Sequence, residues 1–252
     1  MREDELRRIA GKAKVPLGTV EKDYVITLIL KEISELDYFK ELVFKGGTCI
    51  NKMYFPDARF SIDLDFTCLK DVIDKLLIDL NKRLSGKEIG NISFVDVRKE
   101  EERQDGVRLS VGHQDMRGHK TSVKLDLSLR ADIVRKPQPK GVLNTYDLPP
   151  FKLQAMVIEE MLAEKLRATI ARGAPRDIYD TWFLLKKGVN FNLELINRKL
   201  ELLKRDRIFN RNLFIKSLEE KKEGWRRDLV ILLPEVPPFD QVKAEILDSL
   251  RQ

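Results

Sequence analysis

Cysteine and histidine are scarce in this sequence of 252 residues, with two of each. The two cysteines, Cys49 and Cys68, are too few for a disulfide scaffold. We therefore expect free thiols that behave as small core residues, in a reducing and cytoplasmic environment. So few sulfur and imidazole ligands argue against a structural zinc site, and a bound metal is expected to have oxygen ligands.

Long apolar runs are also missing. No stretch approaches the roughly 20 apolar residues of a membrane span, and the charged start MREDELRRIA lacks the apolar core of a signal peptide. Hydrophobic residues make up 42% of the chain and charged residues 35%, which is typical of a water-soluble globular protein. The length allows one large domain or two modest ones.

The net charge of +6 is concentrated in one segment near the C-terminus. Residues 186–230 hold thirteen Lys and Arg against seven Asp and Glu, and Lys204, Arg205, Arg207 and Arg211 are the densest part. A basic surface suits a polyanion, because each phosphate contact releases counterions. A solvated helical surface is the simpler alternative, so the charge alone leaves contact with nucleic acid open.

Hydrophobic periodicity divides the chain into a mixed part and a helical part. Helical spacing predicts helices over 17–36, 48–55 and 71–84, and alternation or β-rich composition predicts strands over 41–45, 59–67, 107–112 and 122–130. Prolines mark loops over 135–150, and the pattern from Phe151 onward is helical. We predict an α+β protein, with a mixed-sheet core and N-terminal helices over 1–150 and a helical C-terminal domain over 151–252.

Three aspartates stand on the polar faces of predicted strands. Asp63 and Asp65 are two residues apart, so both side chains leave one face of the strand 59–67. Asp126 has the same setting on the strand 122–130. If these strands are neighbours, the three carboxylates meet and form a site for Mg²⁺. Two such ions, about 4 Å apart, would suit an in-line phosphoryl transfer. The alternative is that these aspartates only cover the solvated side of the strands.

A Gly-Gly-Thr turn follows the strand 41–45. Gly46 and Gly47 let the backbone approach a ligand closely, and Thr48 can cap the next helix or bind a phosphate oxygen. The turn lacks the Lys-Ser/Thr pair of a Walker loop, which argues against a P-loop NTPase.

Four motifs in this order resemble the AbiEii/AbiGii-type nucleotidyltransferase toxins of the DNA polymerase β-like superfamily, to which the MenT toxins are related. The motifs are Glu21-Lys-Asp-Tyr24; Phe44-Lys-Gly-Gly-Thr48; Arg59-Phe-Ser-Ile-Asp-Leu-Asp-Phe66; and Glu160-Met-Leu-Ala-Glu-Lys-Leu166 with Arg176-Asp-Ile-Tyr-Asp180. They span residues 21–180, about two-thirds of the chain. The family commonly has an acidic residue where this chain has Ile62, a position that the alternation assigns to the core.

The resemblance implies a polymerase β-like nucleotidyltransferase core and a toxin of a toxin–antitoxin or phage-defence system. Relatives are thought to transfer a nucleotide from an NTP to the 3′ end of tRNA. Asp63 and Asp65 match the family's metal-binding pair, and Asp126 matches the third carboxylate. The implied partners are an NTP, an RNA acceptor bound by the basic helices 186–230 and a cognate antitoxin, with no membrane.

The remaining candidates each have a structural alternative. Lys165 points away from the apolar stripe of its helix, so it either binds the triphosphate or pairs with a carboxylate. Asp177 and Asp180 lie in the first turn of the next helix, where acidic residues are common, and only the resemblance makes them site residues. Arg59 and Ser61 share the face of the aspartates and could hold phosphate oxygens, although Arg59 could equally neutralise one of the aspartates.

The leading hypothesis is therefore a Mg²⁺-dependent nucleotidyltransferase, with the triphosphate cradled by Gly47, Thr48 and Ser61. Two other functions use the same residues. A catalytically silent RNA-binding or partner-binding protein would need no metal, and a metal-dependent nuclease would need no NTP. The sequence does not select the NTP or the acceptor.

Overall fold

A computed structural model describes residues 1–202, 208–219 and 222–250. Two compact units make up the chain. The first contains residues 1–131 and 137–155, and the second contains residues 132–136 and 156–252. The sequence analysis divides the chain after residue 150; here residues 151–155 group with the first unit and 132–136 with the second. Each unit is described by itself.

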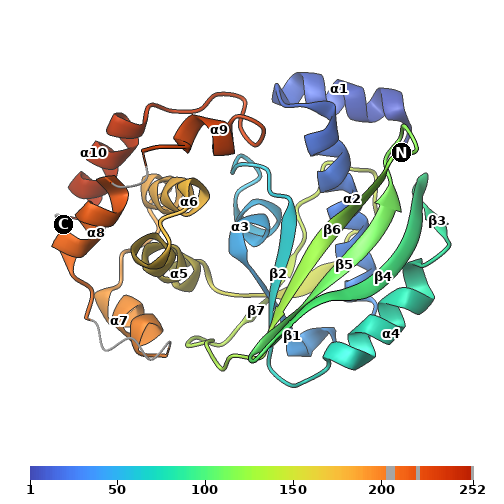
Figure 1. Ribbon diagram of the computed structural model, residues 1–252, viewed down its shortest axis with the longest axis horizontal. Coiled ribbons are helices and arrows are strands. Elements are labelled where there is room, and N and C mark those ends of the chain that lie inside the picture. Colours follow the sequence, from blue (N-terminus) through green and yellow to red (C-terminus); the bar gives the residue numbers. More distant parts are fainter. Residues whose placement is uncertain (203–207, 220–221, 251–252) are drawn as a thin grey trace. The chain divides into compact units, whose positions relative to one another are not determined.

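The first unit is built on a mixed sheet with the order β3-β4-β5-β6-β2-β1-β8-β7 (Figure 1). The strands are β1 (Leu42–Lys45), β2 (Asp63–Cys68), β3 (Glu88–Ile89), β4 (Ile92–Arg103), β5 (Gly106–Gln114), β6 (Lys120–Ser128), β7 (Gln138–Gly141) and β8 (Lys152–Ala155). The pairs β1/β8 and β2/β6 are parallel, and the remaining pairs are antiparallel. This mixed sheet confirms the predicted fold class.

Helices α1 (Glu3–Ala13), α2 (Leu17–Ser34), α3 (Gly46–Cys49) and α4 (Ile73–Leu84) accompany the sheet, and α4 runs alongside β4 (Figure 1). A 3₁₀ turn covers Phe39–Glu41, and a π-helical turn, Ile50–Tyr54, extends α3. The sequence predicts α2 as an amphipathic helix, but its buried residues lie on nearly every side. A helix that is buried all round must satisfy its polar side chains internally, and Glu21 and Asp23 do so as described below.

Three parts of the sheet differ from the sequence prediction. The strand expected over 59–67 begins only at Asp63, because residues 59–62 do not join the ladder. The expected loop contains β7, which tolerates Pro139 because it is the edge strand. The start of the expected helical half is β8, a short strand parallel to β1. A further strand, β4, was not predicted at all, because the charged run KEEER in its second half hides its alternation.

The second unit is helical. Its helices are α5 (Ile158–Ala171), α6 (Pro175–Lys186), α7 (Leu193–Glu201), α8 (Arg211–Glu219), α9 (Trp225–Leu229) and α10 (Phe239–Ser249). Helices α5 and α6 lie side by side (Figure 1) and form the centre against which α7, α8, α9 and α10 pack. The apolar side chains that fill this centre come from all six helices, which explains the continuous helical pattern of the sequence.

A short segment, residues 132–136, belongs to the helical unit although its neighbours on both sides belong to the other one. We call it the strap. The fully buried carboxylate of Glu160 accepts hydrogen bonds from the backbone N–H groups of Val134 and Arg135, both at 2.8 Å. The ammonium group of Lys199 binds Glu160, Glu164 and the Asp132 carbonyl oxygen. Lys199 was counted in the basic segment, but it is a core residue.

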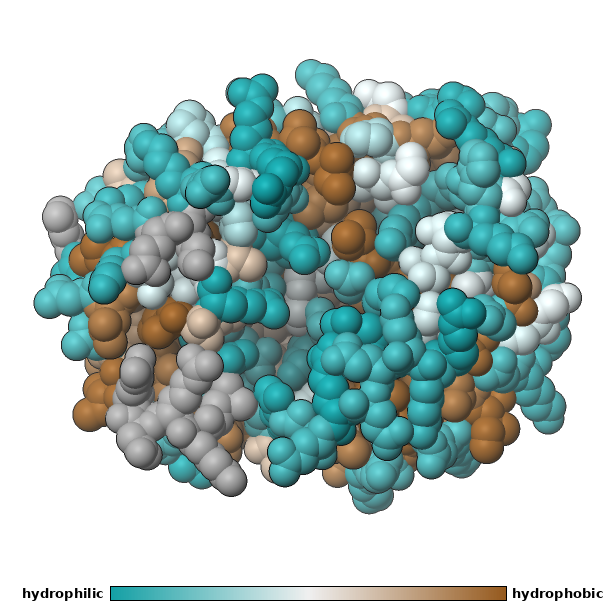
Figure 2. All heavy atoms as spheres, in the orientation of Figure 1, coloured by the Kyte–Doolittle hydropathy of each residue, from teal (hydrophilic) through white to brown (hydrophobic). Residues whose placement is uncertain are grey.

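Cys49 and Cys68 are buried free thiols, as the sequence predicts. Burial raises the pKa of Cys68 to about 12 and that of Cys49 well above its usual value, so both thiols stay protonated at neutral pH. The face shown in Figure 2 is predominantly hydrophilic, with apolar residues in small groups. Among the described helices, none combines the length and apolar character that a bilayer span requires.

Candidate functional site

The aspartates at 63, 65 and 126 lie on one polar face of the sheet, as the sequence predicts. Strands β2 and β6 are parallel neighbours, with Asp65 opposite Asp126 and Asp63 opposite Lys124. On the other side of β2, Lys45 is the register partner of Asp65. Alternation sends Leu64 and Phe66 to the opposite, buried face. The hydrophobic pattern of two strands thus brings Asp65 and Asp126 to facing positions.

Gly46 brings the chain directly against Asp65. Its φ of +79° lies in the left-handed region that favours glycine. A Cβ atom at this position would lie 2.2 Å from the Asp65 Oδ2 atom. The turn between β1 and α3 therefore requires glycine for two independent reasons, and its backbone borders the carboxylate on β2.

Gly47 and Thr48 are buried in the first turn of α3. The Thr48 hydroxyl donates a hydrogen bond to the backbone carbonyl oxygen of Asp63, so it does not cap the helix. This bond ties the Gly-Gly-Thr turn to the first residue of β2. Thr48 therefore fixes the position of the aspartate strand in this structure.

Arg59 and Ser61 precede β2 and lie outside its ladder. Both are buried, with 4% and 7% of their surface exposed, while Phe60 and Ile62 are half-buried. The strict alternation predicted for 59–67 fails here because these residues precede β2. Arg59 Nη1 donates a hydrogen bond to the Phe60 carbonyl oxygen at 3.0 Å. Ile62 is half-buried rather than fully in the core, and the assignment of Arg59 and Ser61 to the aspartate face stays a prediction.

The third carboxylate is held by arginines. Arg108, its register partner on β5, donates to both oxygens of Asp126 at 3.0 and 3.1 Å, and Arg103 approaches to 3.5 Å. In the described part of the chain, no group of three acidic, His or Cys residues has the arrangement of a metal site. A bidentate guanidinium thus engages Asp126 in this structure, and its place in a metal site with Asp63 and Asp65 stays a prediction. Asp63 and Asp65, on one strand face, supply the oxygen donors that Mg²⁺ prefers.

Lys165, Asp177 and Asp180 form a second cluster, inside the helical unit. The Lys165 ammonium lies 3.2 Å from Asp177 Oδ1 and 2.8 Å from Asp180 Oδ2. All three residues are buried. Arg172, with a largely exposed side chain, donates to Asp177 at 2.7 and 3.2 Å. In this structure the carboxylate alternative for Lys165 is realised, and Asp180 pairs with it across α5 and α6.

Burial by itself would raise the pKa of Asp177, but Lys165 and Arg172 overcome that effect and lower it. The carboxylate is therefore charged throughout the physiological range. Two charged carboxylates on one lysine hold its ammonium group in a defined place. Such a fixed cation is a means of orienting an anion, although ion pairs of this kind also occur in purely structural networks.

Several cations of the basic segment 186–230 are paired with carboxylates, so its surface carries less unbalanced positive charge than its composition suggests. Lys204, Arg205 and Arg207 lie outside the described residues. Arg198 pairs with Glu201, Lys222 with Asp240 and Arg227 with Asp228, and Arg211 donates to the Leu247 carbonyl oxygen. Acidic residues of the same and neighbouring helices thus balance several of these cations.

The sequence patterns did not single out Lys45, Arg108, Arg172 or a further, buried cluster. Lys45 and Arg108 were available from the register of the strands, since each stands opposite an aspartate. Arg172 lies after α5 and carries no pattern that would single it out. The buried cluster lies in the first unit: Lys52 pairs with Asp23, and the Tyr146 hydroxyl donates to Asp23 at 2.6 Å. We call it the Asp23 cluster.

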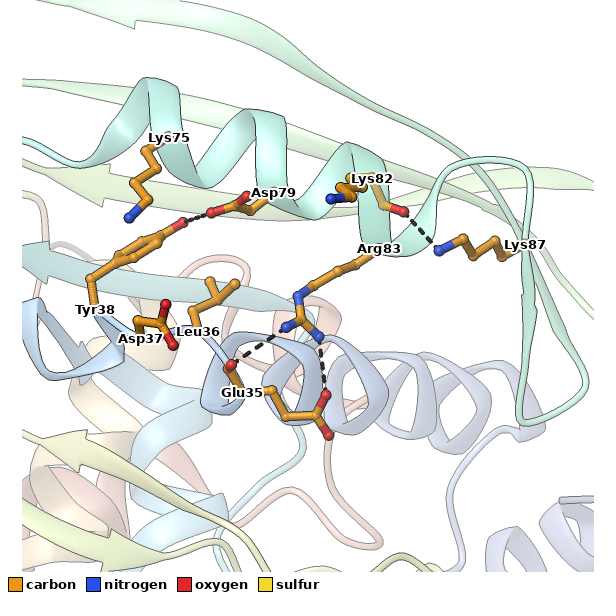
Figure 3. A pocket seen from close by; sticks show the side chains of 9 residues that line it. All are labelled: Glu35, Leu36, Asp37, Tyr38, Lys75, Asp79, Lys82, Arg83 and Lys87. Carbon is orange, nitrogen blue, oxygen red and sulfur yellow. Dashed lines mark hydrogen bonds and ion pairs between the residues drawn. The ribbon is translucent and has the colours of Figure 1, made fainter.

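A pocket of about 350 Å³ lies in the first unit between α4 and the end of α2 (Figure 3). Its charges pair with one another: Tyr38 donates to Asp79 at 2.7 Å, Lys75 lies over the Tyr38 ring, and Arg83 binds Glu35. It contains none of the predicted site residues. A pocket whose cations and anions neutralise each other is a poor anion site, so we assign it no role.

Comparison with known proteins identifies relatives of the whole chain. A family model for "Nucleotidyl transferase AbiEii toxin, Type IV TA system" matches residues 28–245. None of the curated proteins compared with the sequence matches it. The fold is similar to that of MenT4, a nucleotidyltransferase toxin from Mycobacterium tuberculosis H37Rv, with 20% identity, a TM-score of 0.76 and coverage of 99% of this chain and 88% of that one. JHP933 from Helicobacter pylori is also similar, with 21% identity, a TM-score of 0.63 and coverage of 94% and 92%.

Proposed function

Because the chain belongs to the AbiEii family of nucleotidyltransferase toxins, we propose that it transfers a nucleoside monophosphate from an NTP to an RNA acceptor, the 3′ end of tRNA. The observation that supports this proposal is the close approach of the Gly46 turn to Asp65, which shares a strand face with Asp63 and stands opposite Asp126. Carboxylates next to a close backbone approach suit a metal-bound polyphosphate.

The transfer requires one substitution at phosphorus. The acceptor hydroxyl oxygen forms a bond to the α-phosphorus, its proton is released, and the bond to the leaving pyrophosphate breaks. Asp63 and Asp65 would hold Mg²⁺, as two ions, and Asp126, now paired with Arg108, would be the third ligand. When bound, Mg²⁺ would neutralise charge on the reacting phosphates. Catalysis would then depend on positioning and electrostatics rather than on a covalent intermediate.

The chain's own groups would bind and orient the NTP. Gly46 and Gly47 have no side chains of their own, so their backbone N–H groups can be approached by a phosphate. Thr48 holds this turn against β2 through its hydrogen bond to Asp63. We assign Lys165 to the triphosphate, with Asp177 and Asp180 as the residues that hold its ammonium group in place. We assign Arg59 and Ser61, which lie at the entry to β2 with little exposed surface, to phosphate oxygens of the nucleotide.

The acceptor would bind to the basic segment 186–230, whose charge surplus equals that of the whole chain. Its described cations are partly balanced, so we expect modest affinity that falls steeply with salt. We further propose that the protein acts in the cytoplasm, as the toxin of a toxin–antitoxin system with a cognate antitoxin or as part of a phage-defence system.

The test is transfer of radioactivity from each of four α-labelled NTPs to total tRNA, with and without Mg²⁺. Wild type should label tRNA only with Mg²⁺, and Asp63→Asn and Asp65→Asn should lose at least 100-fold in rate, in line with the loss of a preorganised electrostatic group. Asp74→Asn is the matched control, because Asp74 is an exposed carboxylate of the same unit. Equal labelling by wild type and Asp63→Asn would refute the assignment, and shortening of RNA without NTP would favour a nuclease.

A further inference from the structure

The segment Glu21-Lys-Asp-Tyr24 on α2 precedes the residues that the family model matches, and the proposed function does not use it. Three of its four side chains have partners within the first unit. Asp23 belongs to the Asp23 cluster, Tyr24 donates to the Gly90 carbonyl oxygen at 3.0 Å, and Glu21 accepts from the Met116 backbone N–H. These three contacts hold this turn of α2 in a fixed position and orientation.

Lys22 is the fourth residue, and its setting is different. It is half-buried, and with respect to the described residues its ammonium group makes neither a hydrogen bond nor an ion pair. The charges that act on it are Asp63 and Lys124, which face each other across β2 and β6. Burial lowers the pKa of Lys22, an effect that Asp63 opposes and Lys124 reinforces. Helix α2 also packs against β6, the strand that pairs with β2, so the Lys22 side chain lies in the neighbourhood of the first residue of the proposed metal pair.

A partly desolvated ammonium group is unfavourable unless an anion or a hydrogen-bond acceptor reaches it. The other polar groups near the start of β2 are already engaged. Lys124 binds Glu100 and lies 3.4 Å from the Ser110 hydroxyl. Thr48 donates to the Asp63 carbonyl oxygen, and Arg59 donates to the Phe60 carbonyl oxygen. Among these cations, Lys22 is the one whose ammonium group has no hydrogen-bond acceptor in the described part of the chain.

We propose that Lys22 is a substrate-binding residue whose ammonium group contacts a phosphate oxygen of the NTP beside Asp63. This inference rests on the proposed function, because it names the ligand of the same site. Lys22 then contributes affinity for the polyphosphate and not for the base or sugar. A purely structural lysine would affect the affinity for all ligands equally, or the stability of the fold.

The experiment compares wild type with Lys22→Met, Lys22→Gln and Lys22→Arg, and with Lys120→Met as the control, an exposed lysine at the start of β6. Equilibrium binding is measured for an NTP, inorganic triphosphate and the nucleoside, and thermal unfolding is recorded for each variant. Loss of a charge-assisted hydrogen bond should raise the Kd for NTP and triphosphate about tenfold or more. The Kd for the nucleoside should not change, and Lys22→Arg should retain most of the affinity.

Unchanged triphosphate affinity in Lys22→Met and Lys22→Gln would overturn the inference, as would parallel weakening of nucleoside and triphosphate. Both variants are measured because either one could be unstable. Lys22→Arg retains the positive charge and therefore tests whether the charge is what the ligand needs. The proposed function fails separately. If wild type binds no NTP, the nucleotidyltransferase assignment and the role of Lys22 fall together, whereas NTP binding that Lys22→Met leaves intact removes only Lys22.

Discussion

Two buried ionic clusters, one in each unit, differ in how completely their charged groups are shielded from solvent. In the Asp23 cluster, Asp23, Lys52 and Tyr146 are all less than 5% exposed. The Tyr146 hydroxyl, which donates to Asp23, also lies 3.1 Å from the Val20 carbonyl oxygen. In the cluster of Lys165, Asp177 and Asp180, two carboxylates share one ammonium group, and the additional cation, Arg172, has a side chain that is 70% exposed.

This difference separates a structural cluster from a candidate functional one. One ammonium group against one carboxylate, with a tyrosine hydroxyl as the further donor, is balanced in charge and sealed from solvent. Breaking such a cluster leaves a buried charge, so its main effect is on stability. The other cluster reaches charge balance only through Arg172, whose side chain lies at the surface, so it is sealed less completely. We expect changes there to affect activity more than folding.

The largest effect is expected from the sealed cluster. Lys52→Met leaves the Asp23 carboxylate buried without its cation, which should reduce the free energy of unfolding by about 3–5 kcal/mol. Urea denaturation measures this change. Replacing both partners, as Lys52→Met with Asp23→Leu, should recover much of the loss, and Lys40→Met, at an exposed lysine, is the control. A loss below 1 kcal/mol in the single variant would contradict the structural role.

Lys165→Met should reduce the rate of nucleotide transfer about 100-fold, because it removes the cation assigned to the triphosphate. It also leaves two buried carboxylates together, so stability would fall as well. The double variant with Asp180→Asn removes one of these charges and should regain stability without regaining activity. Recovery of both in parallel, in a transfer assay and in denaturation, would assign the cluster to folding alone.

The acid response should distinguish the clusters further. The pKa of Asp177 in the folded protein lies below its ordinary value of about 3.9. Its stabilising contribution is therefore complete above that value and is lost as the pH falls below it. Arg172→Gln removes one cause of the lowered pKa, so it should reduce the stability difference between pH 6 and pH 3 by about 1 kcal/mol, less than for a sealed pair because Arg172 is exposed. An unchanged difference would show that Lys165 alone holds Asp177 charged.

The smallest effect on stability is expected at the sheet surface. Arg108→Gln removes a partly exposed ion pair with Asp126 and should cost about 1 kcal/mol or less. If Asp126 is the third metal ligand, the same variant should lower the Mg²⁺ concentration needed for half-maximal transfer. Asp126→Asn in the Arg108→Gln background should abolish that gain. A metal requirement indifferent to both changes would remove Asp126 from the site.

Much of the fold was predictable from the sequence because alternation and helical spacing depend on burial. The register of Asp65 and Asp126 follows from two strands whose apolar residues must share a face. The misplaced elements have local causes. Residues 59–62 alternate between polar and apolar types but do not join a ladder. Strand alternation therefore did not predict that Arg59 and Ser61 are buried. Pro139 and Pro149 suggest a loop, although an edge strand such as β7 accommodates proline.

The site was less predictable than the fold. Which carboxylate receives a given cation depends on the packing of residues that are distant in sequence, such as Arg108 and Asp126, or Lys52 and Asp23. Composition showed the charge surplus of 186–230 but not that Lys199 is a core residue. Lys22 was visible only as a letter in a motif. Its importance depends on the missing hydrogen-bond partner, which no sequence pattern reveals.

The strap has a practical consequence for anyone who wishes to study the helical half in isolation. A fragment that starts at Met156 would omit residues 132–136, and Glu160 would lose both backbone donors while Lys199 would lose a carbonyl acceptor. Such a truncation would leave an interior carboxylate and its lysine only partly satisfied, and we expect poor yield and aggregation. A circularly permuted gene, or the five strap residues supplied as a peptide, would be the better route to a folded fragment.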